Sequence, residues 1–128
     1  MELVTQNPTS LAWMGDAVFS LKVREHLLDQ GYQQAGKLQK LSAKYCSARG
    51  QSAMLKEMLE KDLLIEDERE IVRRGRNANV HTTAKNADKQ TYMEATALEA
   101  LLGYLYLYHH EERLAELLDF CLMKGDSL

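Results

Sequence analysis

Two acidic residues lie within segments that are otherwise apolar, and both could bind a metal ion. Asp16 lies in the run Leu11–Phe19, and Glu99 lies in the run Ala97–Gly103. A carboxylate among apolar residues is costly unless it is paired, hydrogen-bonded or bound to metal. Two such carboxylates on two core helices could converge on one hard cation with oxygen ligands, as Mg²⁺ prefers. In the opposite interpretation, Asp16 points to solvent and Glu99 pairs with a buried basic residue.

Gly15 comes immediately before Asp16. Glycine weakens a helix by about 1 kcal/mol relative to alanine, and it allows another group to approach the backbone closely. A close contact at this point of the first helix is therefore expected.

The other reactive side chains form no recognisable catalytic or zinc site. The sequence contains no Glu-x-x-His or His-Glu-x-x-His motif, no glycine-rich phosphate loop and no arguable serine–histidine–aspartate set. His109 and His110 are expected to end a helix, where a cation is favourable. Tyr104, Tyr106 and Tyr108 are expected to pack in the core and at an interface rather than to stack on bases.

A basic segment lies on an otherwise acidic chain. The net charge is −3, yet within 73–89 Asp88 alone opposes five basic residues, Arg73, Arg74, Arg76, Lys85 and Lys89. The segment therefore carries +4 and the rest of the chain −7. Arg, Lys, Asn and Thr side chains are those that reach phosphate and sugar oxygens, and A-form RNA presents 2′-hydroxyls and phosphates across a shallow groove. RNA binding is one interpretation, and a solvated helix end with a loop is the other.

Length and composition predict one all-α domain spanning 1–128. The chain has 45% hydrophobic and 27% charged residues, one proline and seven glycines, so long stretches lack helix breakers. No signal peptide and no apolar stretch long enough to span a bilayer is recognised. Cys46 and Cys121 lack metal-type spacing and are expected to be buried thiols in a reducing cytosol. A cytoplasmic protein without a membrane partner is expected.

Apolar periodicity places the helices that must position the two acids. The first begins at Pro8–Ser10, with Thr9 or Ser10 as N-cap, and ends near Gly31. The others are expected over Leu38–Ala48, over Met54–Leu59 after a break near Gly50, from Glu66 to Arg76, over 91–108 and over 112–123. The stretch 91–108 is apolar on nearly every side, which is typical of the central helix of a bundle. Asn77–Asp88 has no periodicity and is predicted to be a loop.

Several motifs together resemble those of a known family. Leu11–Val18 resembles the signature helix of the ribonuclease III catalytic domain, and Glu99–Gly103 resembles its second acidic motif. Arg74–Ala78, Thr82–Asn86 and Gln90–Tyr92 are similar to the smaller subfamily called Mini-ribonuclease III. The resemblance covers nearly the whole chain, in the order and with the spacing of the family.

The resemblance implies an all-α homodimer that hydrolyses double-stranded RNA with Mg²⁺, for which Mn²⁺ could substitute. It implies a role in maturing precursor large-subunit (23S) ribosomal RNA, with a ribosomal protein as a further partner. Catalytic and metal-binding roles carry over to Asp16 and Glu99, and a position at the dimer interface carries over to Trp13. Met14 is expected at the same interface because the first helix is apolar on more than one face, and the alternative is that Trp13 fills the core of one chain. The residues expected to bind RNA are Arg74, Arg76, Asn77, Thr82, Thr83, Lys85 and Asn86.

The sequence departs from full-length ribonucleases III at three acidic positions. Ala12, Thr9 and Thr96 stand where that family has further acids. Two protein carboxylates per site would leave more water around the metal, or a second metal held mainly by substrate phosphate. No separate double-stranded-RNA-binding domain is expected. The rival hypotheses are a non-catalytic double-stranded-RNA-binding dimer in ribosome assembly and a helical protein-interaction module.

Overall fold

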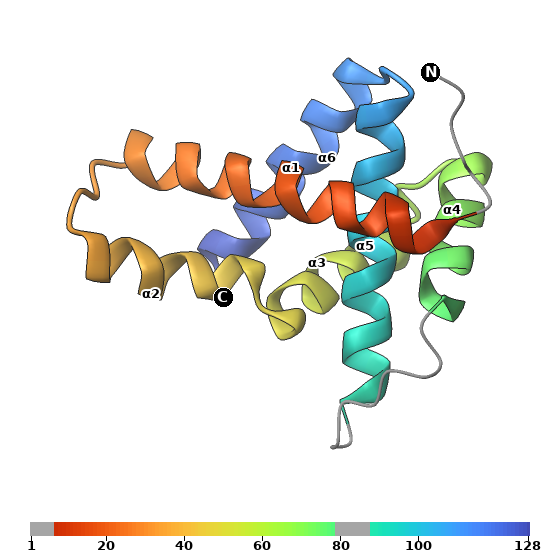
Figure 1. Cartoon of the computed structure of the whole chain (residues 1–128), viewed down its shortest axis with the longest axis horizontal. Coiled ribbons are helices and arrows are strands. Elements are labelled where there is room, and N and C mark those ends of the chain that lie inside the picture. The colour runs from red at the N-terminus through yellow and green to blue at the C-terminus, as the bar shows by residue number, and fades with distance from the viewer. Residues whose placement is uncertain (1–6, 79–87) are drawn as a thin grey trace.

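The computed structural model describes residues 7–78 and 88–128, which form six helices and no strand (Figure 1). The helices are α1 (Pro8–Asp29), α2 (Ala35–Cys46), α3 (Ala48–Glu60), α4 (Glu66–Asn77), α5 (Lys89–Leu107) and α6 (Glu111–Asp126). The predicted all-α class is confirmed. No helix within the described ranges is both long enough and apolar enough to cross a bilayer.

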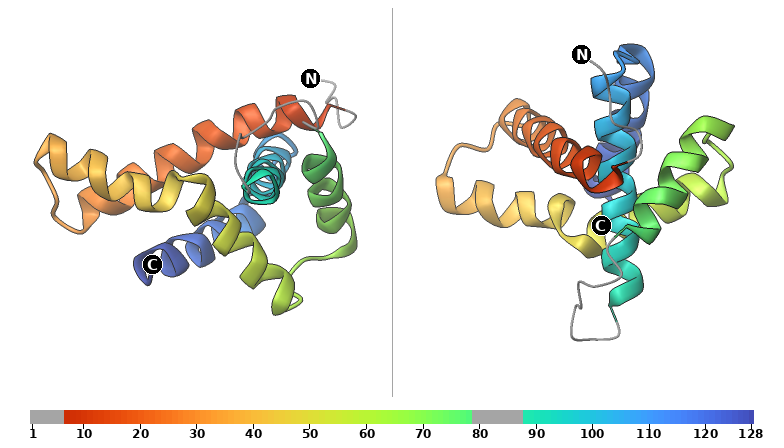
Figure 2. Two further views of the ribbon diagram at one scale, coloured as in Figure 1. Left: turned by 90° about the horizontal axis from the view of Figure 1, so that it is seen from below. Right: turned by 45° about the vertical axis from the view of Figure 1, so that its right-hand side comes forward.

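Helix α5 is the centre of the fold. Figure 2 (left) looks nearly along α5 and shows α1, α3 and α4 arranged around it. Eleven of its residues between Glu94 and Leu105 are buried, so it is enclosed on nearly every side, as the sequence predicted. Beyond the crossing with α5, the second half of α1 and α2 run side by side as an arm that projects from the body (Figure 1).

The N-cap of α1 is Asn7, not Thr9 or Ser10. The Asn7 side chain accepts a hydrogen bond from the backbone N–H of Ser10 at 3.2 Å, and Pro8 occupies the first helical turn. Asparagine caps as well as serine does, and proline is favoured just inside a helix start. The C-terminal prediction is confirmed, because Gly31 follows the helix with φ +94°.

The break between α2 and α3 falls at Ser47 rather than near Gly50. The Ser47 hydroxyl accepts a hydrogen bond from the Gly50 N–H at 3.1 Å, so it caps α3, and Ala48 opens α3 instead of closing α2. Gly50 lies inside the helix for a packing reason. A Cβ atom there would lie 2.4 Å from the carbonyl oxygen of Lys44.

The remaining helix ends follow the predicted pattern within three residues. The Glu68 side chain caps the start of α4, because it accepts a hydrogen bond from the Ile65 N–H at 3.1 Å. It also accepts hydrogen bonds from the guanidinium of Arg113 on α6. Helix α5 ends at Leu107 without a basic residue in its last turn, so the two histidines do not end it: His109, at φ +62°, lies in the turn and His110 is the N-cap of α6. The predicted loop Asn77–Asp88 lies for the most part, 79–87, outside the described residues.

The tyrosine and cysteine predictions are confirmed in part. Tyr104 is buried and contacts Tyr108, with ring centroids 4.7 Å apart, whereas Tyr106 is 51% exposed. Both cysteines are free thiols, but only Cys121 is buried, and Cys46 is half-buried. The position of Cys46 matters because it lies beside the two acids described next.

Candidate active site

Helices α1 and α5 touch backbone to backbone, and this contact brings the two predicted acids together. A Cβ atom on Gly15 would lie 1.7 Å from the carbonyl oxygen of Glu99, and one on Gly103 would lie 1.9 Å from that of Leu11. Only glycine fits at either position, since the obstructing atoms are backbone atoms that cannot rotate away. The close approach predicted at Gly15 is therefore confirmed, and α5 is the group that approaches.

Asp16 and Glu99 form a carboxyl pair at the rim of this crossing. Asp16 is exposed and Glu99 is half-buried. Burial, the negative charge of Asp16 and a hydrogen bond between the two carboxyl groups raise the pKa of Glu99 to about 7, while a hydrogen bond from Gln51 opposes the rise. Asp16 thus does face solvent, as the opposite interpretation held. Glu99 has no basic ion-pair partner among the described residues.

The donor set suits a hard divalent cation. Two carboxyl groups that repel each other at neutral pH are stabilised by a positive ion between them, and Mg²⁺ takes oxygen ligands with several waters retained. No third aspartate, glutamate, histidine or cysteine completes a metal-binding group in the described part of the chain. The hydroxyl of Thr96 donates instead to the Tyr92 carbonyl oxygen at 3.1 Å, one turn back on α5.

Helix α3 supplies a polar contact that the sequence interpretation missed. Gln51 is buried, and its amide nitrogen lies 3.4 Å from Oε2 of Glu99. The signal was present, because Gln51 shares an apolar helical stripe with Met54, Leu55 and Met58. A polar residue in such a stripe needs a buried partner.

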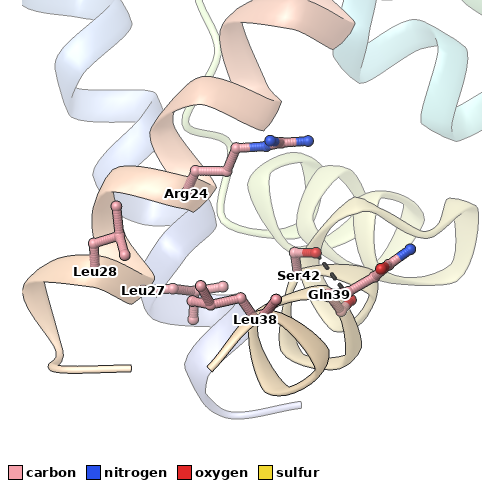
Figure 3. A pocket seen from close by; sticks show the side chains of 7 residues that line it. Arg24, Leu27, Leu28, Leu38, Gln39 and Ser42 are labelled. Atoms are coloured by element: carbon pink, nitrogen blue, oxygen red, sulfur yellow. Dashed lines mark hydrogen bonds between the residues drawn. The ribbon is translucent and has the colours of Figure 1, made fainter. Parts of the chain in front are cut away.

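Cys46, the last residue of α2, interacts electrostatically with both acids. Burial raises the pKa of the Cys46 thiol, and the charges of Asp16 and Glu99 raise it further, while Ser20 and Arg24 act in the opposite direction. The Cys46 thiol therefore lies within electrostatic range of both acids and of Arg24. Arg24 lines a groove between α1 and α2, where Leu27 and Leu38 also lie (Figure 3).

The described part of the basic segment lies against the other side of α5. A Cβ atom on Gly75 of α4 would lie 2.9 Å from the Cα of Ala97, so α4 ends tightly against the turn of α5 that carries Glu99. Arg73 and Arg74 both pair with Glu70, at 2.7 and 3.0 Å.

Arg76 differs from these two arginines, because its buried Nε has no hydrogen-bond partner within the ranges that the structure describes. Asn77 is exposed at the helix end. The other predicted RNA-binding residues, Thr82, Thr83, Lys85 and Asn86, lie outside the described residues.

Trp13 and Met14 lie on an apolar face of α1 beside the acids. Trp13 is 77% exposed, so it does not fill the core of one chain. Met14 lines an apolar groove formed by α1, α5 and α6, together with Ala17, Leu21, Tyr106, Leu114 and Leu118. Large exposed apolar residues that gather on one face commonly mark an interface.

Comparison with known proteins agrees with this arrangement. Residues 9–110 match the Ribonuclease III domain family. The chain is 45% identical over 121 residues to Mini-ribonuclease 3 of Streptococcus pneumoniae, covering 94% of both chains. It is 44% identical over 113 residues to Mini-ribonuclease 3 of Staphylococcus aureus, covering 88% of this chain and 84% of the relative.

A solved structure agrees as well. The crystal structure of a protein from Fusobacterium nucleatum superposes with a TM-score of 0.79 at 30% identity, covering 94% of this chain and 93% of that protein. Sequence and fold lead to the same assignment: the chain belongs to the ribonuclease III family of endoribonucleases, in the Mini-ribonuclease III group.

Proposed function

We propose that the protein hydrolyses phosphodiester bonds of double-stranded RNA with Mg²⁺, leaving a 5′-phosphate and a 3′-hydroxyl. The observation that carries the proposal is the carboxyl pair of Asp16 and Glu99, which come from two helices and meet at a partly exposed rim. Family membership supports the reaction class. Mn²⁺ is expected to substitute for Mg²⁺, because it also favours carboxylate and water ligands.

Asp16 and Glu99 would hold the ion through carboxylate oxygens. When bound, Mg²⁺ acidifies a water molecule and stabilises negative charge on the scissile phosphate. Glu99 must lose its proton before it can bind, and its pKa of about 7 makes metal binding weaker as the pH falls below 7. Lys85, which lies outside the described residues, is proposed to help neutralise the phosphate.

The basic end of α4 would hold the RNA backbone. Arg76 suits this role, because it is half-buried at the basic end of α4 and arginine side chains reach phosphate oxygens. Arg74 and Asn77 are proposed to act with it, together with Thr82, Thr83, Lys85 and Asn86. Such contacts with phosphate and sugar would select duplex shape rather than sequence.

Two copies of the chain are proposed to act together. The strands of a duplex are related by local two-fold axes, so a two-fold dimer presents two sites in matching orientation. One chain supplies one Asp16 and one Glu99, and cutting both strands in one encounter requires two copies. The exposed Trp13, beside the groove lined by Met14, is the proposed contact.

The proposed natural substrate is precursor large-subunit (23S) ribosomal RNA, processed in the cytoplasm with a ribosomal protein as a further partner. The support for this step is the similarity to the Mini-ribonuclease III group. Cleavage of the isolated duplex at the ends of the precursor, with and without ribosomal proteins, would test it separately from the chemistry.

The chemistry is tested by incubating purified protein with a long duplex RNA in Mg²⁺ or in EDTA. Cleavage to 5′-phosphorylated products is expected in Mg²⁺ alone. Asp16→Asn and Glu99→Gln should each lose cleavage while still binding RNA, whereas Glu25→Gln, which removes an exposed acid from the same helix α1, should cut normally. RNA that is bound but left intact by the wild-type protein would support the non-catalytic alternative. RNA that is neither bound nor cut would leave the protein-interaction alternative.

A further inference from the structure

Helix α3 presents two consecutive buried polar side chains to α5. Gln51 is 2% exposed and Ser52 is 3% exposed. The Gln51 amide nitrogen lies 3.4 Å from Oε2 of Glu99, and the Ser52 hydroxyl donates to Oε1 of Glu94 at 2.5 Å. Two neighbours on one helix therefore contact two acids on the central helix, and only one of those acids belongs to the carboxyl pair.

In the contact between Gln51 and Glu99, Gln51 is the hydrogen-bond donor. An ionised carboxylate only accepts hydrogen bonds, so the amide must turn its NH₂ group toward Glu99. A buried amide without a partner would cost about 1–3 kcal/mol. A distance of 3.4 Å is long for such a bond, and hydrogen bonds at reactive groups are often long before the ligand is present. The amide occupies one carboxylate oxygen and leaves the other for a cation.

The backbone around Gln51 is fixed on both sides. Gly50 fits against the Lys44 carbonyl oxygen, where a Cβ atom would lie at 2.4 Å, and this contact holds the start of α3 on α2. Ser52 and Lys56 both reach Glu94, with Lys56 Nζ at 3.7 Å from Oε1. Glu94 is 5% exposed, so these links set α3 against α5 inside the core. The backbone at Gln51 is therefore held in place on both sides.

We propose that Gln51 is a positioning residue for the metal site: its amide holds Oε2 of Glu99, so that the carboxylate is oriented toward a divalent cation shared with Asp16. Without this donor, only the hydrogen bond with Asp16 holds the Glu99 side chain, and the Glu99 carboxylate can turn away from the cation. Ser52 and Glu94 support the helix but do not touch the pair. The inference rests on the proposed function for its metal, but it can be tested without RNA.

The test measures Mn²⁺ binding by electron paramagnetic resonance in the absence of RNA, for wild-type protein and for Gln51→Met. Methionine keeps the length of the side chain and removes the donor. Loss of an outer hydrogen bond to a metal ligand typically weakens binding 10–100-fold, so we expect the Mn²⁺ dissociation constant to rise about tenfold. The rate of RNA cleavage should fall at low Mg²⁺ and recover as Mg²⁺ is raised, with KM for RNA unchanged.

Two further variants separate positioning from simple damage. Gln51→Asn keeps an amide that is too short to reach Glu99, and it should reproduce the methionine result even if Gln51→Met fails to fold. Ser52→Ala removes the neighbouring contact with Glu94, while the Gly50 contact with α2 and the Lys56–Glu94 ion pair still hold α3, so Mn²⁺ affinity should stay within twofold of wild type. Equal losses for Ser52→Ala and Gln51→Met would overturn the proposal, because they would indicate a general disturbance of α3.

Other outcomes are equally decisive. A folded Gln51 variant with wild-type Mn²⁺ affinity overturns the proposal, whether or not that variant cuts RNA at the normal rate. A wild-type protein that binds no Mn²⁺ overturns it as well, since Glu99 would then have no ion to be positioned for. A protein that binds Mn²⁺ but cuts no RNA would refute the proposed function alone, and the Mn²⁺ titration would still decide the role of Gln51.

Discussion

Replacing Glu99 with glutamine should stabilise the metal-free protein at pH 8 while it removes the proposed metal site. Glu99 has a pKa of about 7 because it is partly buried beside Asp16. At pH 8 the folded wild-type protein therefore holds two adjacent negative charges, which separate on unfolding. A neutral amide at position 99 can donate to Asp16 and accept from Gln51, as a protonated carboxyl would.

The size of the effect follows from the pKa of Glu99. The pKa of Glu99 rises from 4.5 to about 7 on folding, and each pKa unit corresponds to about 1.4 kcal/mol, which sets a ceiling of about 3.5 kcal/mol. Water around the exposed Asp16 screens part of this repulsion, so we expect about 2 kcal/mol. A raised carboxyl pKa contributes stability below pH 4.5 that is lost as the pH rises to 7. The free energy of unfolding of Glu99→Gln should therefore exceed that of wild type only slightly at pH 4.5. The difference should grow with pH and level off above pH 7.

The assay is urea unfolding at fixed protein concentration, in EDTA, from pH 4.5 to 8.5. The free energy of unfolding of Glu99→Gln minus that of wild type should grow with pH over this window. Adding Mg²⁺ at pH 8 should stabilise the wild-type protein more than the variant, because a bound ion favours the folded state. A difference that does not change with pH, or that has the opposite sign at pH 8, would refute the account of the carboxyl pair.

Three further predictions concern the contacts that surround the site. Gly15→Ala should lower the free energy of unfolding in urea by about 3 kcal/mol or more, because its Cβ would lie 1.7 Å from a backbone atom of α5. The same change should weaken Mn²⁺ binding. A variant as stable as wild type would contradict the close crossing of α1 and α5. Trp13→Glu should yield monomers in analytical ultracentrifugation and lose double-strand cleavage, and a persistent dimer would place the interface elsewhere. Neutralising Arg76 and Lys85 together should lower RNA affinity and reduce the salt slope of log K by about two, whereas an unchanged slope would show that RNA binds another surface.

The sequence by itself determined the class of the fold and indicated the two acids proposed to bind metal. Long stretches without proline favoured helices, and the position of α5 at the centre followed from apolar residues on nearly every side. Asp16 and Glu99 were recognisable because a carboxylate is costly in an apolar segment. These features are local, since they depend on residues within a few turns of one another along one helix.

Tertiary structure decided how these parts meet. Asp16 and Glu99 lie side by side because Gly15 and Gly103 let the backbones of α1 and α5 touch. Such a fit between two backbones cannot be recognised from the residues of either helix alone. The same holds for Gln51, whose partner lies on another helix. Periodicity shows which face of a helix is buried, but it does not show what lies opposite that face. Contacts between residues far apart in the chain arise only when helices pack, and the carboxyl pair is one of them.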